Sequence, residues 1–150
     1  MDLTPRSENH ITRAFCTAVV TAHGGRDPHV VSADQRLRID LAPSSSGRRG
    51  RGGRSTTPEE LFAAGYAACF EAALRVIARA QNSPLGDIRV TAEVSFGPTQ
   101  AGAYALSVAL RAHIEGLSSD ETIALMTIAH DVCPQSRATR GNIEVHLAAE

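Results

Sequence analysis

Three cysteines, at positions 16, 69 and 133, are the most reactive side chains of this 150-residue chain. Three thiols cannot all pair within one chain, and a domain of this length buries enough apolar core to need no disulfide. Cys69 and Cys133 are too far apart along the chain to form a Cys-x-x-Cys motif. We therefore interpret the thiols as either reactive or inert, and not as parts of structural disulfides. Only tertiary structure can bring Cys69 and Cys133 together.

Cys69 lies in a strongly apolar stretch, where burial disfavours the thiolate that a nucleophile needs. That position alone is typical of a small buried hydrophobic residue. Moving a thiol pKa from about 8.5 to below 7 takes about 2 kcal/mol, and one guanidinium at about 4 Å contributes about 4 kcal/mol at an effective dielectric near 20. Arg26, on a Gly24-Gly25 turn, is the candidate cation, and its alternative is a solvated loop charge. Cys133 precedes Pro134 among polar residues, where we expect a more accessible thiol.

Two carboxylates open the helix that carries Cys69. Glu60 is explained by a capping box with Thr57, which leaves Glu59 free to orient an arginine through paired hydrogen bonds. Glu59 and Cys69 are ten residues apart, about 15 Å along a helix axis. They cannot share a site on one straight helix. Either the helix bends near Gly65, or the carboxylate comes from a second copy of the chain, and we favour the second copy.

The elements that must position these groups are predicted by hydrophobic periodicity. Alternation of apolar and polar residues predicts strands over 11–22, 29–32, 35–42, 88–96, 104–114 and 143–147. Capping boxes at Thr57-Pro58-Glu59-Glu60 and Ser118-x-x-Glu121 predict helices over 57–80 and 119–132. The first helix is apolar on nearly every side, so we expect protein to wrap it. This order predicts a single α+β domain, residues 1–150, with helices against antiparallel sheet.

Composition excludes several functions. All 15 basic residues are arginine, so a Schiff-base lysine, a pyridoxal-phosphate lysine and a Gly-Lys-Ser/Thr phosphate loop are impossible. The net charge of −1 argues against a broad nucleic-acid surface. No charge-free run of about 18 apolar residues occurs and residues 1–10 form a polar arm, so we expect a cytoplasmic protein without a membrane partner. The Ser/Gly/Arg-rich segment 43–56 is expected to be a mobile loop.

Two long motifs closely resemble the cysteine motifs of the organic hydroperoxide resistance (Ohr) proteins, which belong to the OsmC superfamily. They are TPEELFAAGYAACF at 57–70 and HDVCPQSRATRGNI at 130–143. The element order matches over nearly the whole chain. The resemblance implies an intertwined homodimer, with antiparallel sheets around a long buried central helix and two sites at the subunit interface.

The same resemblance implies a thiol peroxidase. Cys69 would be the peroxidatic residue, Cys133 the resolving one, and Arg26 with Glu59 the activating pair. Members of the family reduce organic hydroperoxides, including those of fatty acids, and take electrons from dihydrolipoyl groups. The expected reductant is therefore dihydrolipoamide or a lipoylated protein, with no metal or organic cofactor. Three aromatic residues form either an apolar substrate pocket or plain core: Phe62, Tyr66 and Phe70.

Other interpretations remain open from the sequence. An OsmC-type peroxidase of the sister branch would use the same cysteine pair, although the pattern around Cys133 favours the Ohr branch. The Gly/Arg segment 47–54 resembles RNA-binding segments but lacks interleaved aromatics. His130 with Cys133 and either other cysteine would suit zinc, but only one compact pair is present.

This sequence also departs from the family pattern. Thr56-Thr57 replaces a pair that commonly ends in asparagine, the segment 47–54 is unusually basic, and Cys16 has no counterpart. We interpret Cys16 as a buried strand residue, with a third thiol near the site as the alternative.

Overall fold

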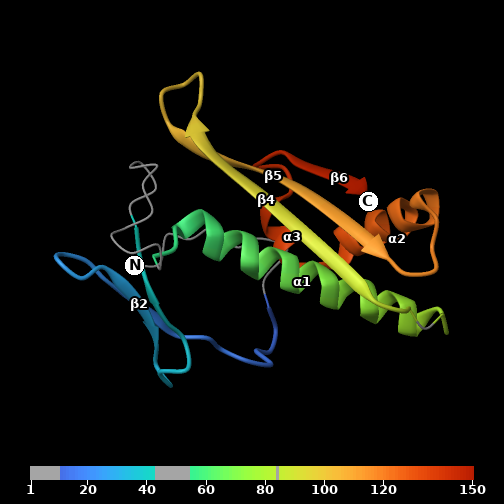
Figure 1. Ribbon diagram of the computed structural model, residues 1–150, viewed down its shortest axis with the longest axis horizontal. Coiled ribbons are helices and arrows are strands. Elements are labelled where there is room, and N and C mark those ends of the chain that lie inside the picture. Colours follow the sequence, from blue (N-terminus) through green and yellow to red (C-terminus); the bar gives the residue numbers. More distant parts are fainter. Residues whose placement is uncertain (1–10, 43–54, 84) are drawn as a thin grey trace.

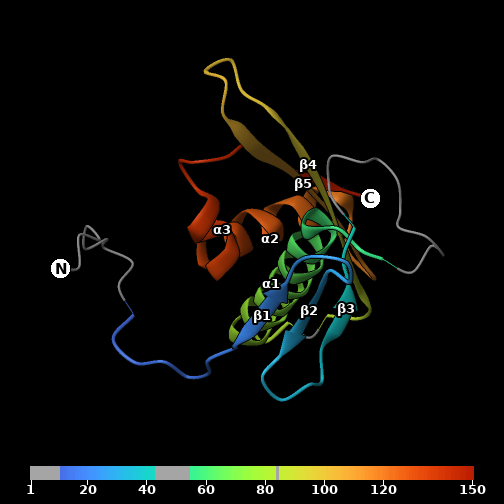
Figure 2. The same cartoon turned by 90° about the vertical axis from the view of Figure 1, so that its left-hand side faces the viewer.

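The computed structural model describes residues 11–42, 55–83 and 85–150, so the predicted arm 1–10 and most of the predicted loop 43–56 lie outside the described residues. The elements follow the order β1, β2, β3, α1, β4, β5, α2, α3, β6. Strands β1 to β3 form one three-stranded sheet and β4 to β6 another. Figure 1 shows the first sheet at one end of α1, clear of the second sheet, and Figure 2, turned by 90°, shows the first sheet in front of α1. The α+β class is therefore confirmed.

Helix α1 (Pro58–Ala80) begins where its capping box predicts. The Thr57 hydroxyl accepts the Glu60 amide and the Glu60 carboxylate accepts the Thr57 amide, while Pro58 occupies the first turn. The helix continues through Gly65 without a break. It is long and apolar enough to cross a membrane by length and composition alone, but one of its faces packs in the protein core, and core helices of this kind meet the same criterion.

The long hairpin predicted after α1 is confirmed. Strands β4 (Ile88–Pro98) and β5 (Tyr104–Ile114) pair antiparallel along their whole length. Strand β6 (Val145–Ala149) pairs parallel to β5, so this sheet is mixed and not antiparallel throughout. The chain leaves β5, crosses through two helices and returns in the same direction, which is the connection that parallel neighbours require.

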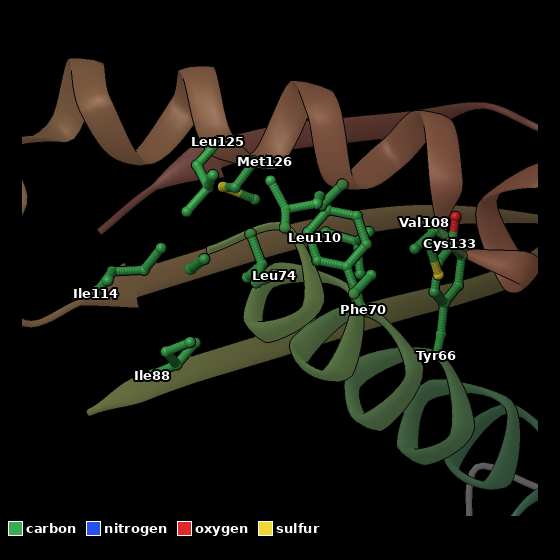
Figure 3. Packing of buried hydrophobic residues seen from close by; sticks show 14 residues of the cluster. Tyr66, Phe70, Leu74, Ile88, Val108, Leu110, Ile114, Leu125, Met126 and Cys133 are labelled. Atoms are coloured by element: carbon green, nitrogen blue, oxygen red, sulfur yellow. The ribbon is translucent and has the colours of Figure 1, made fainter. Parts of the chain in front are cut away.

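Helix α2 (Ser119–Val132) begins at the predicted capping box of Ser118 and Glu121. Pro134 then opens a separate short helix, α3 (Pro134–Thr139). The core lies where α1 and α2 pack on the sheet, as Figure 3 shows. Its fully buried members from these elements are Tyr66, Phe70, Leu74, Leu110, Ile114, Met126 and Cys133.

The first sheet is smaller than predicted. Its antiparallel strands are β1 (Val20–His23), β2 (His29–Ser32) and β3 (Arg38–Asp40). Residues 11–19 form no strand and are exposed, so the prediction of a strand over 11–22 is wrong for its first nine residues. A strand needs a neighbour that satisfies its backbone groups, and none of the described residues pairs with this segment as a strand. Cys16 lies in this segment and is exposed, which corrects its interpretation as a buried strand residue.

Candidate active site

Two cysteines from distant parts of the chain meet at one point. Cys69 lies in the middle of α1, and Cys133 lies at the junction of α2 and α3. The Cys133 Sγ donates a hydrogen bond to the Cys69 Sγ across 3.5 Å. Both thiols are free, and a disulfide bond is about 2.05 Å long, so the two sulfurs need only about 1.5 Å of approach to bond.

The exposure of the two thiols is the reverse of the prediction. Cys133 is 0% exposed, whereas Cys69 is partly exposed. The polar residues around Cys133 in the sequence suggested access, but its side chain belongs to the buried core cluster with residues of α1, α2 and the sheet. Cys69 is therefore the sulfur that a solute reaches first.

The Cys69 thiol is not activated within one chain. Burial raises the pKa of Cys69, and this effect outweighs a hydrogen bond from the main chain of Gln135 that lowers it. No cation among the described residues contributes to the pKa of this thiol. The arrangement holds two sulfurs ready to join, yet it lacks the positive charge that a thiolate needs.

The predicted activating pair lies elsewhere in the single chain. Arg26 is exposed on the turn between β1 and β2 and forms no ion pair within the described residues. Glu59 is half-buried in the first turn of α1, and it too forms no ion pair there. Because α1 passes Gly65 uninterrupted, Glu59 stays about 15 Å from Cys69 along the axis. The structure thus brings Cys69 and Cys133 together and leaves Arg26 and Glu59 apart from them.

A buried hydroxyl cluster, which the sequence analysis missed, holds α3 beside α1. The Tyr66 hydroxyl lies 2.9 Å from Ser136 Oγ and 3.1 Å from Thr139 Oγ1, and all three side chains are buried. The signal for it is the i, i+3 spacing of Ser136 and Thr139 just after Pro134, which places both hydroxyls on one helix face. Since Cys133 directly precedes α3, this cluster fixes the backbone from which its thiol projects.

The three aromatic residues assigned to a pocket divide between core and surface. Tyr66 and Phe70 are fully buried in the core, which corrects their assignment as pocket residues. Phe62 packs edge-on against Tyr66 and lines an open pocket of about 360 Å³. Gln135, whose main chain bonds Cys69, lines the same pocket. Its other walls are Tyr104, Ala105, Leu106, Ala138, Thr139, Asn142 and Ile143.

Metal binding has no support in the described part of the chain. No group of three or more His, Cys, Asp and Glu side chains there could hold an ion. His130 Nδ1 is buried and makes no hydrogen bond to a described residue. Burial, and then the charge of Arg140, lowers the pKa of His130, which favours the neutral imidazole.

Comparison with known proteins gives a consistent family. The profile of the family described as OsmC-like protein matches residues 50–148. The organic hydroperoxide resistance protein OhrA of Bacillus subtilis is 46% identical over 138 residues, which cover 91% of this chain and 97% of that protein. The crystal structure of an organic hydroperoxide resistance protein from Legionella pneumophila superposes with a TM-score of 0.81 at 47% identity, covering 92% of this chain and 99% of that one. One from Vibrio cholerae, with captopril bound in one of the active sites, gives 0.82 at 42% identity, with 94% and 96% covered.

Proposed function

The chain belongs to the OsmC-like family, among the organic hydroperoxide resistance proteins, and from this premise we propose that it is a thiol peroxidase that reduces organic hydroperoxides to alcohols. The observation that carries the proposal is the 3.5 Å approach of Cys69 Sγ and Cys133 Sγ. The Bacillus subtilis, Legionella pneumophila and Vibrio cholerae relatives described above, at 42–47% identity, are named for organic hydroperoxide resistance, which favours this branch over the sister branch.

The proposed reaction uses both sulfurs in turn. The Cys69 thiolate attacks the distal oxygen of the hydroperoxide, so that the O–O bond breaks and the alkoxide leaves to take a proton and become an alcohol. Cys69 is thereby oxidised to a sulfenic acid. The Cys133 sulfur then attacks the Cys69 sulfur, which releases water and forms a Cys69–Cys133 disulfide. Because the two sulfurs already lie 3.5 Å apart, this closure competes well with further oxidation of Cys69 by a second hydroperoxide.

A second copy of the chain completes the site in this proposal. The thiolate needs a cation that the described residues of its own chain do not supply, and Arg26, oriented by Glu59, would supply it across a homodimer interface. There the guanidinium also stabilises the charge on the leaving alkoxide. The Vibrio cholerae relative has more than one active site, as a symmetric dimer would.

Uncovered apolar surface supports the same dimer. One face of α1 is exposed and carries only small or apolar residues, with Val76 60% exposed. The first sheet and the segment before it expose further large apolar side chains, and no described helix packs broadly against them. A monomer rarely leaves that much apolar surface in water. The exposed members on these surfaces are Ala64, Ala68, Ala72 and Val76 on α1, and Ile11, Phe15, Val19, Val20 and Leu37 at the first sheet.

The pocket beside Gln135 is the proposed place for the organic part of the substrate. Its walls are mainly apolar and its volume of about 360 Å³ suits a small organic ligand. Phe62, Leu106 and Ile143 would gain from contact with an alkyl or acyl chain, and hydrogen peroxide has no such part to offer. The substrate class therefore follows from the pocket together with the thiols.

The proposed reductant is a dihydrolipoyl dithiol, free or carried by a lipoylated protein. Because Cys69 is partly exposed and Cys133 is buried, the incoming dithiol would attack the Cys69 sulfur and release Cys133 first. Its second thiol would then regenerate Cys69. The dithiol is a co-substrate and not a resident cofactor, and the proposal assigns the protein to the cytoplasm.

The proposal is tested by counting thiols before and after one equivalent of an alkyl hydroperoxide. Peptide mapping should show the loss of two of the three thiols and one crosslinked peptide that joins Cys69 to Cys133. Cys16 should stay free and serves as the internal control. Three unchanged thiols would refute the proposal, as would a crosslink that involves Cys16.

A further inference from the structure

Two histidines flank the turn that carries Arg26. His23 ends β1 and His29 begins β2, and the two are paired across the strands. Their rings stack with centroids 4.7 Å apart and an interplanar angle of 13°. The stack therefore closes the base of the loop 24–28, with Arg26 at its middle.

A hydrogen bond ties the second histidine to the interior of that loop. His29 Nδ1 lies 2.8 Å from the Asp27 main-chain oxygen. A carbonyl oxygen can only accept, so Nδ1 carries the proton and donates it. The Asp27 carboxylate lies 3.9 Å from the same nitrogen, and the His29 side chain is only 14% exposed. His29 thus fixes the residue directly after Arg26.

The rest of the turn has little to hold it. Gly24 and Gly25 lie in open space, and Gly25 adopts a φ of +94°, which suits glycine. Two consecutive glycines carry a large conformational entropy that folding must overcome. Pro28 has no amide hydrogen to donate across the turn. The Leu41 amide holds Pro28 by donating to its main-chain oxygen at 2.8 Å, and the His29 bond holds Asp27, one residue nearer to Arg26.

We propose that His29 is a positioning residue for Arg26, which it holds through its hydrogen bond to the Asp27 main-chain oxygen. The inference rests on the proposed function of Arg26 as the cation that activates Cys69 in the partner copy. A guanidinium on a loose loop samples many positions, and each displacement of about 1 Å weakens its action on the thiolate steeply. An ordered turn keeps the guanidinium in the orientation that the site uses.

The environment of His29 is mixed in charge. Across the sheet, its neighbours on the same face are His23 in β1 and Asp40 in β3. Arg38 lies two residues from Asp40 on that face. Since this face carries both the Asp40 carboxylate and the Arg38 guanidinium, the proposal assigns His29 a geometric role, and the hydrogen-bond donor is the part to test.

Two substitutions separate the donor from the ring. His29→Phe keeps an aromatic ring against His23 and removes the donor to Asp27. His29→Asn removes the ring and places an amide N–H near the position of Nδ1. Each is made in the full-length dimer, alone and together with Arg26→Ala, and dimer size and circular dichroism confirm folding. The measurements are kcat/KM for an alkyl hydroperoxide and the pH dependence of Cys69 alkylation by iodoacetamide, located by peptide mapping.

The expected activities depend on whether residue 29 can still donate a hydrogen bond to Asp27. His29→Phe lowers kcat/KM about tenfold and shifts the pH midpoint of Cys69 alkylation upward, whereas His29→Asn stays within about twofold of the unaltered protein. In the Arg26→Ala background, His29→Phe has no further effect, because the group that it positions is gone. Arg26→Ala alone shows the larger loss.

Different results would overturn the positioning role of His29 and the proposed function of Arg26. Full activity of His29→Phe overturns the positioning role. The same holds if His29→Asn is as defective as His29→Phe, or if the defect persists unchanged in the Arg26→Ala background. An active Arg26→Ala protein with an unshifted alkylation profile overturns instead the proposed function of Arg26 itself.

Discussion

The two sheets of this chain differ in what lies against them. The inner face of the β4–β6 sheet is covered by α1 and α2, and Leu110 and Ile114 on it are almost completely buried. The β1–β3 sheet has no comparable cover, and Phe15 just before it is 89% exposed. The first of these regions is complete within one chain, whereas the second needs another surface. The thiols belong to the complete region and Arg26 to the incomplete one, so the proposed site spans both.

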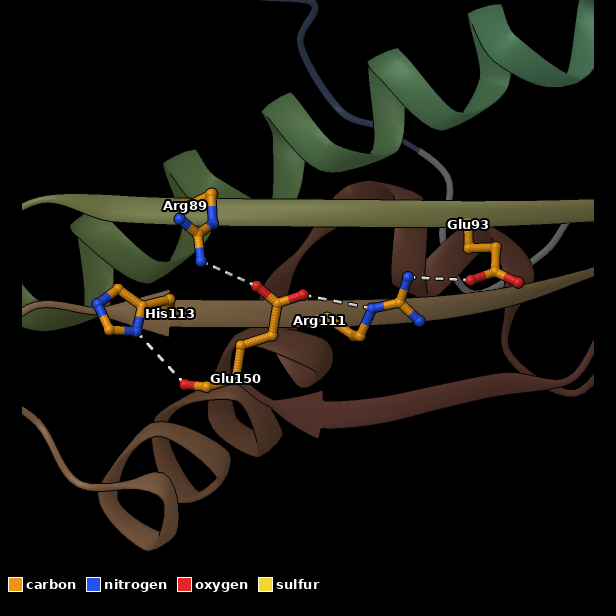
Figure 4. A network of polar contacts seen from close by, with 5 residues as sticks. All are labelled: Arg89, Glu93, Arg111, His113 and Glu150. Atoms are coloured by element: carbon orange, nitrogen blue, oxygen red, sulfur yellow. Dashed lines mark hydrogen bonds and ion pairs between the residues drawn. The ribbon is translucent and has the colours of Figure 1, made fainter.

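The outer face of the β4–β6 sheet carries a network of charged side chains. Arg111 bonds Glu93 at 3.0 Å and Glu150 at 3.4 Å, and Arg89 bonds Glu150 at 3.1 Å. His113 Nδ1 also lies 3.3 Å from the Glu150 main-chain oxygen (Figure 4). Exposed ion pairs of this kind add little stability, but their charged groups remain hydrated. No further layer is needed on this face, in contrast to the apolar side chains of the first sheet.

The largest effect is expected from the complete region, at its nucleophile. Cys69→Ser should reduce hydroperoxide turnover to the uncatalysed rate, because a serine hydroxyl does not ionise at neutral pH. Cys133→Ser should still release one equivalent of alcohol per site and then stop at the sulfenic acid. Cys16→Ser is the matched control and should turn over normally. Stopped-flow assays of peroxide loss distinguish these outcomes, and sustained turnover by Cys69→Ser would contradict the assignment.

The next effect concerns the uncovered face of α1. Val76→Arg places a charge on this face and should convert a dimer into monomers, with kcat/KM lowered about 100-fold because the cation of the other copy is lost. Gln81→Arg, at the exposed end of the same helix, is the control and should remain dimeric. Light scattering after size-exclusion chromatography measures the mass. A fully active monomer of Val76→Arg would remove the case for a shared site.

A smaller effect is expected on the free energy of unfolding when the buried hydroxyl cluster is broken. Tyr66→Phe removes a buried hydroxyl that bonds both Ser136 and Thr139, and it should lower the free energy of unfolding by about 1–2 kcal/mol. Tyr104→Phe is the matched control, since Tyr104 is 71% exposed and should be near neutral. Chemical denaturation measures both. Equal stability of the two variants would show that the hydroxyl cluster does not anchor α3.

The smallest effect is a pH dependence at the start of α2. The Ser118 main-chain amide and hydroxyl hold the pKa of Glu121 below its usual value. A depressed pKa contributes stability that is present above the usual glutamate pKa of about 4.3 and is lost as the pH falls through the lower, folded-state value. Glu121→Gln should therefore melt slightly below the unaltered protein at pH 7, and the gap should close in acid. A gap that is the same at pH 3 and pH 7 would contradict this.

Prediction from the sequence was most accurate where local rules alone determine the secondary structure. The capping boxes at Thr57 and Ser118 place the starts of α1 and α2 correctly, and strict alternation places the β4–β5 hairpin. It failed where the outcome depends on distant neighbours. Residues 11–19 alternate like a strand but have no partner strand among the residues that the structure describes, and the parallel pairing of β6 depends on a crossover.

The candidate site divides in the same way. The meeting of Cys69 and Cys133 was anticipated from a family resemblance, and spacing alone does not give it. Which thiol is buried could not be predicted, because Cys133 is buried in the core cluster with residues of α1, α2 and the sheet. The spacing of Glu59 and Cys69 did anticipate that one straight helix cannot serve one site, since that argument needs only helix geometry.

The most direct test of a site shared between two copies is to mix two inactive chains. Arg26→Ala chains keep Cys69, and Cys69→Ser chains keep Arg26, so a mixed dimer would contain one intact site and one doubly altered site. Co-refolding at equal amounts should restore about a quarter of the unaltered activity, because about half of the dimers are mixed and each has one working site of two. Native mass spectrometry confirms that mixed dimers form. Mixed dimers with no more activity than Arg26→Ala alone would contradict the shared site.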